Sequence, residues 1–213
     1  MKKIVLLVLL GLFLAGTQSF SQMKCGANAG LNIANVVMSP SGGNSPKSVT
    51  GFHAGVFCDY MIMKSLGVGA GLFYTTRGSK SEMTVFTTTA TMTTTLSYLE
   101  IPITGKYYFD AGPAKIFVAA GPYVAYGLGG KMKTEQTGQP SETTTVKWGS
   151  GENDNVKSMD AGLTFGAGAE ISKFIVALNY DLGLSNMIPK PVNSETMKSR
   201  VFGISVGYIF CEH

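Results

Sequence analysis

Eight strand-like segments of this sequence are joined by connections that alternate between short and long. Each segment combines β-branched and aromatic residues with a period of two, which is typical of strands. In an up-and-down barrel, successive connections lie on opposite rims, so the alternation predicts tight turns on one rim and long loops on the other. The segments run approximately over 25–37, 51–62, 66–78, 94–109, 115–128, 157–171, 173–185 and 199–211. The short connections are 63–65, 110–114 and 172–173, and the long ones are 38–50, 79–93, 129–156 and 186–198.

The two faces of each segment also differ in a regular way. In 173–185, for example, Val176, Leu178 and Tyr180 oppose Asn179 and Asp181. The polar face carries glycine and a few charges rather than the Lys, Glu and Asn of a solvent-exposed face, so we assign the apolar face to lipid and the polar face to a narrow lumen. An open sheet edge in lipid would leave backbone groups without partners. The sequence therefore predicts an all-β fold, an eight-stranded antiparallel up-and-down transmembrane β-barrel.

The first 21 residues have the features of a secretory signal peptide. Two lysines precede an apolar run, Ile4 to Ala15, which is shorter than the roughly 20 residues of a membrane-spanning helix. Ser19 and Ser21 are small residues at the positions expected before a cleavage site. We therefore predict that 1–21 is a signal peptide that is removed, and that 22–213 is one β-barrel domain exported to the cell outer membrane.

The composition excludes several classes of partner. Only 14% of the residues are charged, against about 25% in ordinary soluble domains. The 17 Lys and Arg residues are nearly balanced by 13 Asp and Glu residues, which disfavours a nucleic-acid partner and leaves outer-membrane lipid as the expected one. The sequence has no metal-ligand spacing and no phosphate-binding loop, so we expect no cofactor.

One block of the sequence resembles a known family. Ser97 to Ile103 (SYLEIPI), followed by Lys106 to Phe109 (KYYF), is similar to the signature strand of the PorT-like outer-membrane β-barrel family of Bacteroidetes. Further segments that resemble this family are Cys25 to Asn32, Asp160 to Glu170, Tyr180 to Leu184 and Gly203 to Phe210. The resemblance covers nearly the whole of 22–213 and implies an eight-stranded barrel of OmpA or OmpX size. The member that names the family is implicated in protein secretion and maturation, a role that does not transfer on fold alone.

Charged residues on, or near, the lumen side of the predicted strands are candidates for a network. Buried charges are costly unless they are paired, so four acids and three bases can form salt bridges that plug the lumen. A gated pore or proton path is the alternative, but eight strands leave room for side chains and little else. Glu100 and Arg200 are the pair-forming residues to test first, and the sequence leaves open which base faces which acid. The full set is Glu100, Lys106, Lys115, Asp160, Glu170, Asp181 and Arg200.

Three cysteines lie near one rim of the predicted barrel, on neighbouring strands. Two interpretations stay open for Cys25, Cys58 and Cys211: three small apolar wall residues, which the sequence favours, or one disulfide formed in an oxidising compartment. If a disulfide forms, the strand period favours Cys25–Cys58, because it turns both outward and turns Cys211 inward.

The sequence predicts no enzyme. His53 could serve as a catalytic base, but no recognisable nucleophile motif accompanies it. We expect a non-enzymatic integral barrel that is envelope-structural or accessory to secretion or adhesion; a small channel or transporter is the alternative, and a membrane-embedded hydrolase is less favoured. Loops 79–93 and 129–156 are the expected contacts with envelope or secretion-system proteins.

Two details of the long loops are also predicted. Eight threonines within 84–95 suggest that the flanking strands continue as a hairpin above the membrane. The only tryptophan, Trp148, is expected at the lipid–water boundary, with a partner-binding role as the alternative.

Overall fold

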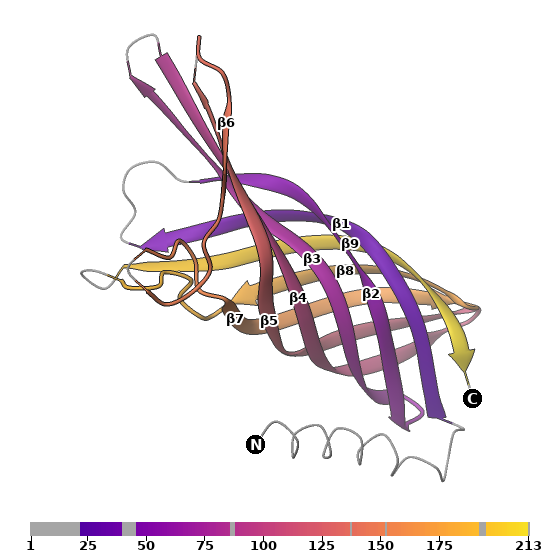
Figure 1. Ribbon diagram of the computed structural model, residues 1–213. Helices are drawn as coiled ribbons and strands as arrows, with labels where there is room; N and C mark the ends of the chain where they lie inside the picture. Colours follow the sequence, from indigo (N-terminus) through magenta and orange to yellow (C-terminus); the bar gives the residue numbers. More distant parts are fainter. Residues whose placement is uncertain are drawn as a thin grey trace.

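The computed structural model describes residues 22–39, 46–85, 88–136, 138–151, 153–191 and 195–212. These residues form nine strands in one sheet (Figure 1). The strands are β1 (Met23–Ser39), β2 (Lys47–Met63), β3 (Leu66–Val85), β4 (Thr88–Ala111), β5 (Ala114–Gln136), β6 (Glu142–Thr145), β7 (Met159–Ile171), β8 (Phe174–Gly183) and β9 (Thr196–Glu212). Within these ranges, no helix has the length and apolar character needed to cross a bilayer. The predicted signal peptide, 1–21, lies outside the described residues.

Eight of the strands close into a ring. Each strand from β1 to β5 pairs with the next, β5 pairs with β7, and the order continues through β8 to β9, which pairs with β1. All these pairings are antiparallel, and the closing seam runs from Lys24 opposite Glu212 to Ser39 opposite Thr196. Each of the eight predicted segments overlaps one strand of the ring, so the predicted eight-stranded antiparallel barrel is confirmed. The short strand β6 lies outside the ring and pairs with β5.

The barrel wall presents its large apolar side chains to the outside. Exposed apolar residues occur on all eight ring strands, and Leu31 and Val206, for example, are 59% and 64% exposed. Outward aromatic rings contact each other in pairs: Tyr107 meets Phe109 edge-on at the short-turn rim, and Phe52 meets Tyr74 at a tilt further along the strands. A wall of this kind is stable in lipid and would aggregate in water.

The three short connections are tight turns, as the sequence predicts. Lys64–Ser65, Gly112–Pro113 and Ser172–Lys173 join consecutive ring strands at one rim. Gly112 has a φ of 68°, which glycine adopts at little steric cost, whereas Ser172 adopts a left-handed φ of 55° despite its side chain. Short turns at this rim restrict the longer connections to the opposite rim.

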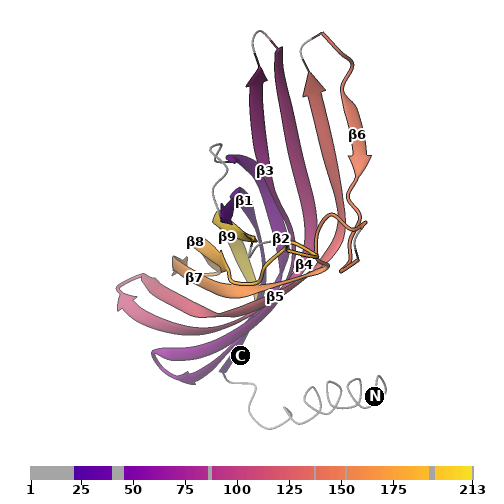
Figure 2. The ribbon, with the colours of Figure 1, turned by 90° about the vertical axis from the view of Figure 1, so that its left-hand side faces the viewer.

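Beyond the ring, β3, β4 and β5 continue and form, together with β6, a four-stranded sheet that projects from the barrel (Figure 2). The predicted continuation of 84–95 as a hairpin is confirmed, because β3 and β4 stay paired up to Val85 opposite Thr88. Much of 79–93 and part of 129–156, predicted as loops, are therefore strand. The physical reason is the β-branched threonines, which favour extended backbone. We call this region (79–85, 88–97, 129–136 and 142–145) the projecting sheet.

Charged residues of the projecting sheet form exposed ion pairs. Lys80 lies 3.0 Å from Glu82, and Lys47 donates a hydrogen bond to the same carboxylate. These hydrogen bonds lower the pKa of Glu82, and a hydrogen bond from Lys133 lowers the pKa of Glu135 in the same way. Such exposed pairs contribute little stability.

Candidate functional site: a lumen closed at two levels

The guanidinium of Arg77 is the centre of the outer plug, at the end of the lumen that carries the projecting sheet. The Arg77 side chain, on β3, is 2% exposed. Its Nη1 lies 2.8 Å from Asp160 on β7, and its Nη2 pairs with Glu100 on β4 and lies 3.6 Å from Asp181 on β8. Three carboxylates therefore converge on one cation, which makes that cation indispensable to the charge balance of the plug.

Neutral side chains complete the outer plug. Tyr123 on β5 and Ser199 on β9 each donate a hydrogen bond of 3.0 Å to Asp160 Oδ2. The rings of Tyr98 and Tyr123 lie 5.4 and 4.9 Å from the guanidinium carbon of Arg77, within the range of cation–π contacts. The outer plug thus joins β3, β4, β5, β7, β8 and β9 across the lumen.

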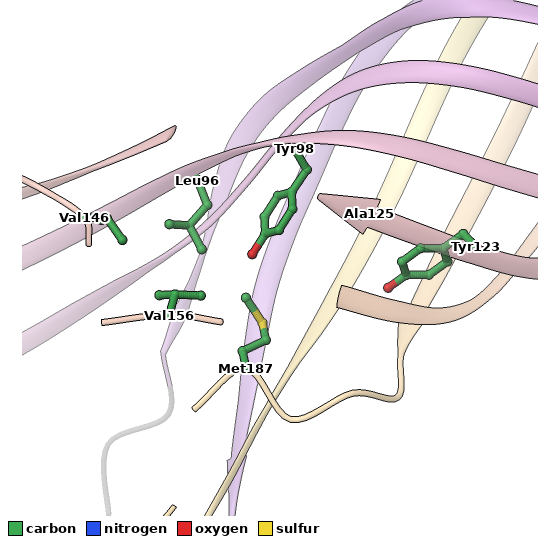
Figure 3. Close-up of a cluster of buried hydrophobic side chains, with 7 residues drawn as sticks. All are labelled: Leu96, Tyr98, Tyr123, Ala125, Val146, Val156 and Met187. Atoms are coloured by element: carbon green, nitrogen blue, oxygen red, sulfur yellow. The ribbon is translucent and has the colours of Figure 1, made fainter. Parts of the chain in front are cut away.

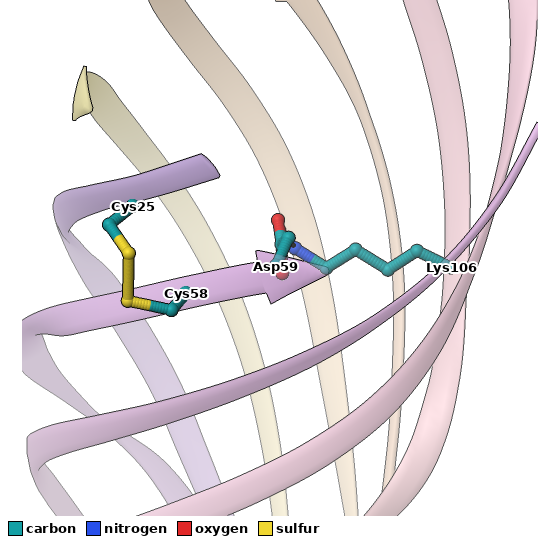
Figure 4. The surroundings of a disulfide bond; sticks show 4 residues. All are labelled: Cys25, Cys58, Asp59 and Lys106. Carbon is teal, nitrogen blue, oxygen red and sulfur yellow. Dashed lines mark hydrogen bonds and ion pairs between the residues drawn. A yellow bond between two sulfur atoms is a disulfide. The ribbon is translucent and has the colours of Figure 1, made fainter. Parts of the chain in front are cut away.

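Two lysines and their acidic partners form the inner plug, at the short-turn end of the lumen. Lys106 on β4 reaches across to Asp59 on β2, with 2.7 Å between Nζ and Oδ2 (Figure 4). Lys24 on β1 lies 2.9 Å from Glu170 on β7 and 3.4 Å from Glu212 on β9. Lys24 therefore ties the first strand to the last and helps to close the barrel.

Aromatic rings contact both lysines of the inner plug. Lys106 Nζ lies 5.2 and 5.4 Å from the ring centroids of Phe57 and Phe117, and Lys24 Nζ lies 5.5 Å from the ring centroid of Tyr108. These rings belong to an apolar cluster that fills the short-turn end. Its buried members are Phe57, Tyr108, Phe117, Ile175, Ala177 and Ile209.

A chamber of about 120 Å³, lined by both polar and apolar side chains, lies between the two plugs. His53 and Asn32 face this chamber. Asn32 Nδ2 donates a hydrogen bond to Thr75, so the other amide atom of Asn32, Oδ1, is an acceptor. His53 Nδ1 donates to Asn32 Oδ1, with 2.7 Å between the two atoms. Asn28 Oδ1 and Asp59 Oδ1 line the same chamber and have no hydrogen-bond partner among the described residues. A cavity of this size and polarity suits a few ordered waters.

An apolar cap covers the outer plug. Its core contains Leu96 and Tyr98 of β4 together with Val146, Val156 and Met187 of the long connections (Figure 3). Tyr98 and Met187 point toward one another, so the connections fold back over the mouth of the barrel (Figure 3).

Trp148 also belongs to this cap, which corrects the predicted position at the lipid–water boundary. Its ring packs edge-on against Tyr98, with 5.3 Å between centroids. A Cβ at Gly127 would lie 2.3 Å from the Trp148 ring, so only glycine leaves room for it there. The sequence could not show that the 129–156 connection turns inward.

Five of the seven charged residues proposed for the lumen lie in the two plugs. Glu100, Asp160 and Asp181 surround Arg77, Lys106 pairs with Asp59, and Glu170 pairs with Lys24. The partners of these five residues are Arg77, Asp59 and Lys24, none of which belongs to the set that the sequence suggested.

Lys115 and Arg200 are corrections to that network. Lys115 stands at the short-turn rim, opposite Asp110, where it is exposed and forms no ion pair with another described residue. Arg200 has the same strand parity as the outward Phe202, and its Nη1 donates to the carbonyl oxygens of Gly183 and Ser199. Glu100 pairs with Arg77 rather than with Arg200, because parity directs Arg200 away from the lumen.

Sequence reasoning missed four charged residues of the plugs: Lys24, Asp59, Arg77 and Glu212. The period of two from Gly67 through Thr75 already places Arg77 on the glycine face of β3. Arg77 escaped notice because it stands one residue before the predicted end of its strand. Lys24 lies one residue before the predicted start of the first strand, and a longer strand would have included it.

The structure joins Cys25 to Cys58 in a disulfide between β1 and β2, on the outward face (Figure 4). Cys211 is directly opposite Cys25 on the other neighbouring strand, β9. The prediction that Cys211 turns inward is wrong, because a β-bulge at Phe210 shifts the register: Gly26 is opposite Ile209, whereas Cys25 is opposite Cys211.

No candidate catalytic or metal site emerges from the described residues. His53 is hydrogen-bonded to the amide of Asn32 and not to a carboxylate within the described part of the chain. The described residues also contain no group of three or more His, Cys, Asp or Glu residues arranged to hold a metal ion. The lumen is instead occupied by paired charges and aromatic rings, which obstruct it.

The fold and the obstructed lumen define a small closed β-barrel whose wall faces lipid. Residues 17–189 match the family described as outer membrane protein beta-barrel domain. The chain belongs to this family, and it is an outer-membrane protein. The short-turn rim is therefore the periplasmic one, and the projecting sheet is extracellular.

Several solved outer-membrane proteins are similar to this chain. Ail, the attachment invasion locus protein of Yersinia pestis, solved in complex with the heparin analogue sucrose octasulfate, is 14% identical over 89% of this chain and 99% of Ail, with a TM-score of 0.42. Neisserial surface protein A is 15% identical over 87% of this chain and 97% of its own, with a TM-score of 0.42. OprG from Pseudomonas aeruginosa is 11% identical over 88% of this chain and 94% of OprG, with a TM-score of 0.44. A comparison with curated proteins gives no match.

Proposed function

We propose that this protein is a non-enzymatic, non-conducting outer-membrane barrel that presents the projecting sheet for contact with partners outside the cell. The observation that carries the proposal is the contrast between a lumen blocked at two levels and a sheet that extends beyond the membrane. A transport protein requires a continuous path, which the Arg77 cluster and the Lys24 and Lys106 pairs obstruct. A contact protein requires an exposed surface, and the paired strands of the projecting sheet provide one.

The chemistry of the projecting sheet favours contact with a polypeptide. Its strands carry threonines and exposed lysine and glutamate side chains, and β6 forms one edge of the sheet. An edge strand offers backbone groups that can pair with an extended segment of another chain. The proposed partners are envelope or secretion-system proteins that reach 79–93 and 129–156.

Two finer assignments are part of the proposal. The Leu-Glu-Ile-Pro block at 99–102 supports a place within the PorT-like group of Bacteroidetes. The apolar run after the two N-terminal lysines supports removal of 1–21 during export, which leaves 22–213 as the mature barrel domain.

A small channel is the second candidate, because the chamber between the plugs, which several polar side chains line, is part of a path along the lumen. Planar-bilayer recordings on the refolded protein separate the two. We expect no steps of conductance from the wild-type protein. Regular single-channel steps that are altered by Arg77→Met would contradict the proposal and support a channel gated at the outer plug.

Photo-crosslinking in native outer membranes tests the contact surface. A crosslinker would be placed at Met92 on the projecting sheet or at Thr143 on β6, both of which are exposed, and at Ile204 on the lipid-facing wall as a matched control. We expect a discrete protein adduct from the first two positions that is absent from Ile204. Lipid adducts alone from all three positions would refute a protein contact at the sheet.

A further inference from the structure

Three cysteines stand in a row across three neighbouring strands. Cys25 on β1 is opposite Cys58 on β2 and also opposite Cys211 on β9. Residues directly opposite in antiparallel pairs have Cα atoms about 4.5–5.5 Å apart, within the range of about 4.4–6.8 Å that disulfides use. Cys25 can therefore pair with either neighbour, and it pairs with Cys58 in this structure.

All three side chains share the outward face. Directly opposite residues lie on the same side of a sheet, and Cys58 stands between the outward residues Val56 and Tyr60, which are 51% and 46% exposed. Ile209 is buried, so strict alternation along β9 would turn Phe210 outward and Cys211 inward. The bulge at Phe210 adds one residue to β9 and thereby brings Cys211 to the outward face as well. The bulge therefore completes the row.

The order of the row matches the geometry of thiol–disulfide exchange. In this reaction a thiolate attacks one sulfur of a disulfide, in line with the bond that breaks. Cys211 and Cys58 lie on opposite sides of Cys25, so a nucleophile on β9 and a leaving group on β2 flank the central sulfur. Cys211 carries a thiol outside the disulfide.

We propose that Cys25, Cys58 and Cys211 form an intramolecular thiol–disulfide exchange centre that moves the disulfide between the β1–β2 hairpin and the β1–β9 seam. The Cys211 thiolate attacks Cys25 Sγ, a Cys25–Cys211 bond forms, the Cys25–Cys58 bond breaks, and Cys58 leaves as the thiolate. Cys58 then takes up the proton that Cys211 lost. One disulfide and one thiol are present before and after, so the step needs no oxidant or reductant.

The two positions of the disulfide have different consequences for the barrel. Cys25–Cys58 links strands that are adjacent in sequence and can form before the last strand is made. Cys25–Cys211 links the first strand to the last, across the seam that closes the ring. The longer loop restricts the unfolded chain more, so exchange strengthens a barrel that has already closed.

The test compares the wild-type protein with Cys211→Ser, both refolded in detergent and checked for the altered gel migration of a folded, unheated barrel. After incubation at mildly alkaline pH without added thiol, a pulse of iodoacetamide labels each thiol, acid stops exchange, and peptide mapping identifies the labelled cysteine. We expect label on both Cys58 and Cys211 in the wild-type protein and no label on Cys58 in Cys211→Ser. Label on Cys211 alone in the wild-type protein would overturn the proposal without any variant.

A second pair of variants tests the row itself. Cys58→Ser should form Cys25–Cys211 under mild oxidation and, once denatured without reductant, migrate faster because most of the chain is enclosed in a loop. Cys25→Ser is the matched control, in which Cys58 and Cys211 should stay as thiols because β1 separates them. Failure of folded Cys58→Ser to form the Cys25–Cys211 bond, or formation of Cys58–Cys211 in the control, would refute the exchange centre.

Discussion

The two ends of the lumen are closed by different arrangements of charge. At the outer plug, Arg77 alone balances Glu100, Asp160 and Asp181. At the inner plug, the positive charge is divided between two lysines with different acidic partners, and each lysine lies over at least one aromatic ring. The outer plug is therefore a single hub, whereas the inner plug has two cations, each with its own acidic partner.

This difference determines how each end responds to the loss of one side chain. Loss of the hub leaves three carboxylates close together in a water-poor interior, which is the most costly outcome for buried charges. Loss of one inner lysine leaves at most one or two acids without a partner, and one of these, Glu212, is 48% exposed at its side chain. The stability of the barrel should therefore depend more on the outer plug.

The largest effect is expected from Arg77→Met. Removing the hub should lower the free energy of unfolding by about 3–5 kcal/mol, the usual cost of breaking a buried ion pair. Urea titration of the barrel refolded in lipid vesicles measures the change. Arg200→Met is the matched control, since Arg200 bonds only to backbone oxygens in the described structure, and it should cost much less. Equal losses of unfolding free energy in the two variants would show that Arg77 is no more important to stability than Arg200, which lies outside the plugs.

The inner plug should show a smaller and recoverable loss. Lys106→Met should cost about 2–3 kcal/mol because it leaves the buried Asp59 carboxylate without its cation. The double variant Lys106→Met/Asp59→Leu should regain most of that loss, since an apolar pair replaces the whole ion pair. A double-mutant cycle from urea titrations measures the coupling. Additive losses would show that Lys106 and Asp59 do not act as a pair.

Two tyrosines of the outer plug should respond with different magnitude and sign. Tyr123→Phe removes a hydroxyl that donates to Asp160 and should cost about 1.5–3 kcal/mol, as for hydrogen bonds to charged groups. Tyr98→Phe removes a buried hydroxyl that has no partner among the described residues, so stability should stay equal or rise by roughly 1 kcal/mol. Thermal or urea unfolding compares them, and a loss in Tyr98→Phe as large as in Tyr123→Phe would contradict the assignment.

The smallest effect is expected outside the membrane, at Glu82. The pKa of Glu82 is lowered by hydrogen bonds from Lys47 and Lys80. The contribution of Glu82 to the free energy of unfolding is therefore present above the ordinary carboxylate pKa, and it is lost as the pH falls through the lowered pKa. NMR titration of the Glu82 carboxyl in nanodiscs should give a pKa below 4.5 that returns toward 4.5 in high salt. A Lys47→Met/Lys80→Met variant should abolish the shift; an unchanged pKa would show another cause.

Most of the wall could be predicted, because lipid imposes a strict pattern on it. Val176, Leu178 and Tyr180 had to share the outward face of one strand, and the turn at 172–173 had to be tight. The partners within the lumen could not be predicted in the same way. Glu100 meets Arg77 because β3 and β4 are adjacent with Phe73 opposite Glu100, and that register depends on the whole ring.

The sequence by itself determined the number of ring strands, their antiparallel order and the face that meets lipid, since each of these follows from local alternation and from the lengths of the connections. Only the tertiary structure decided which charges pair, that Trp148 caps the barrel, and that the bulge at Phe210 turns Cys211 outward. These features depend on register and on contacts between distant segments, and a one-residue shift between two strands reverses the face of every following side chain.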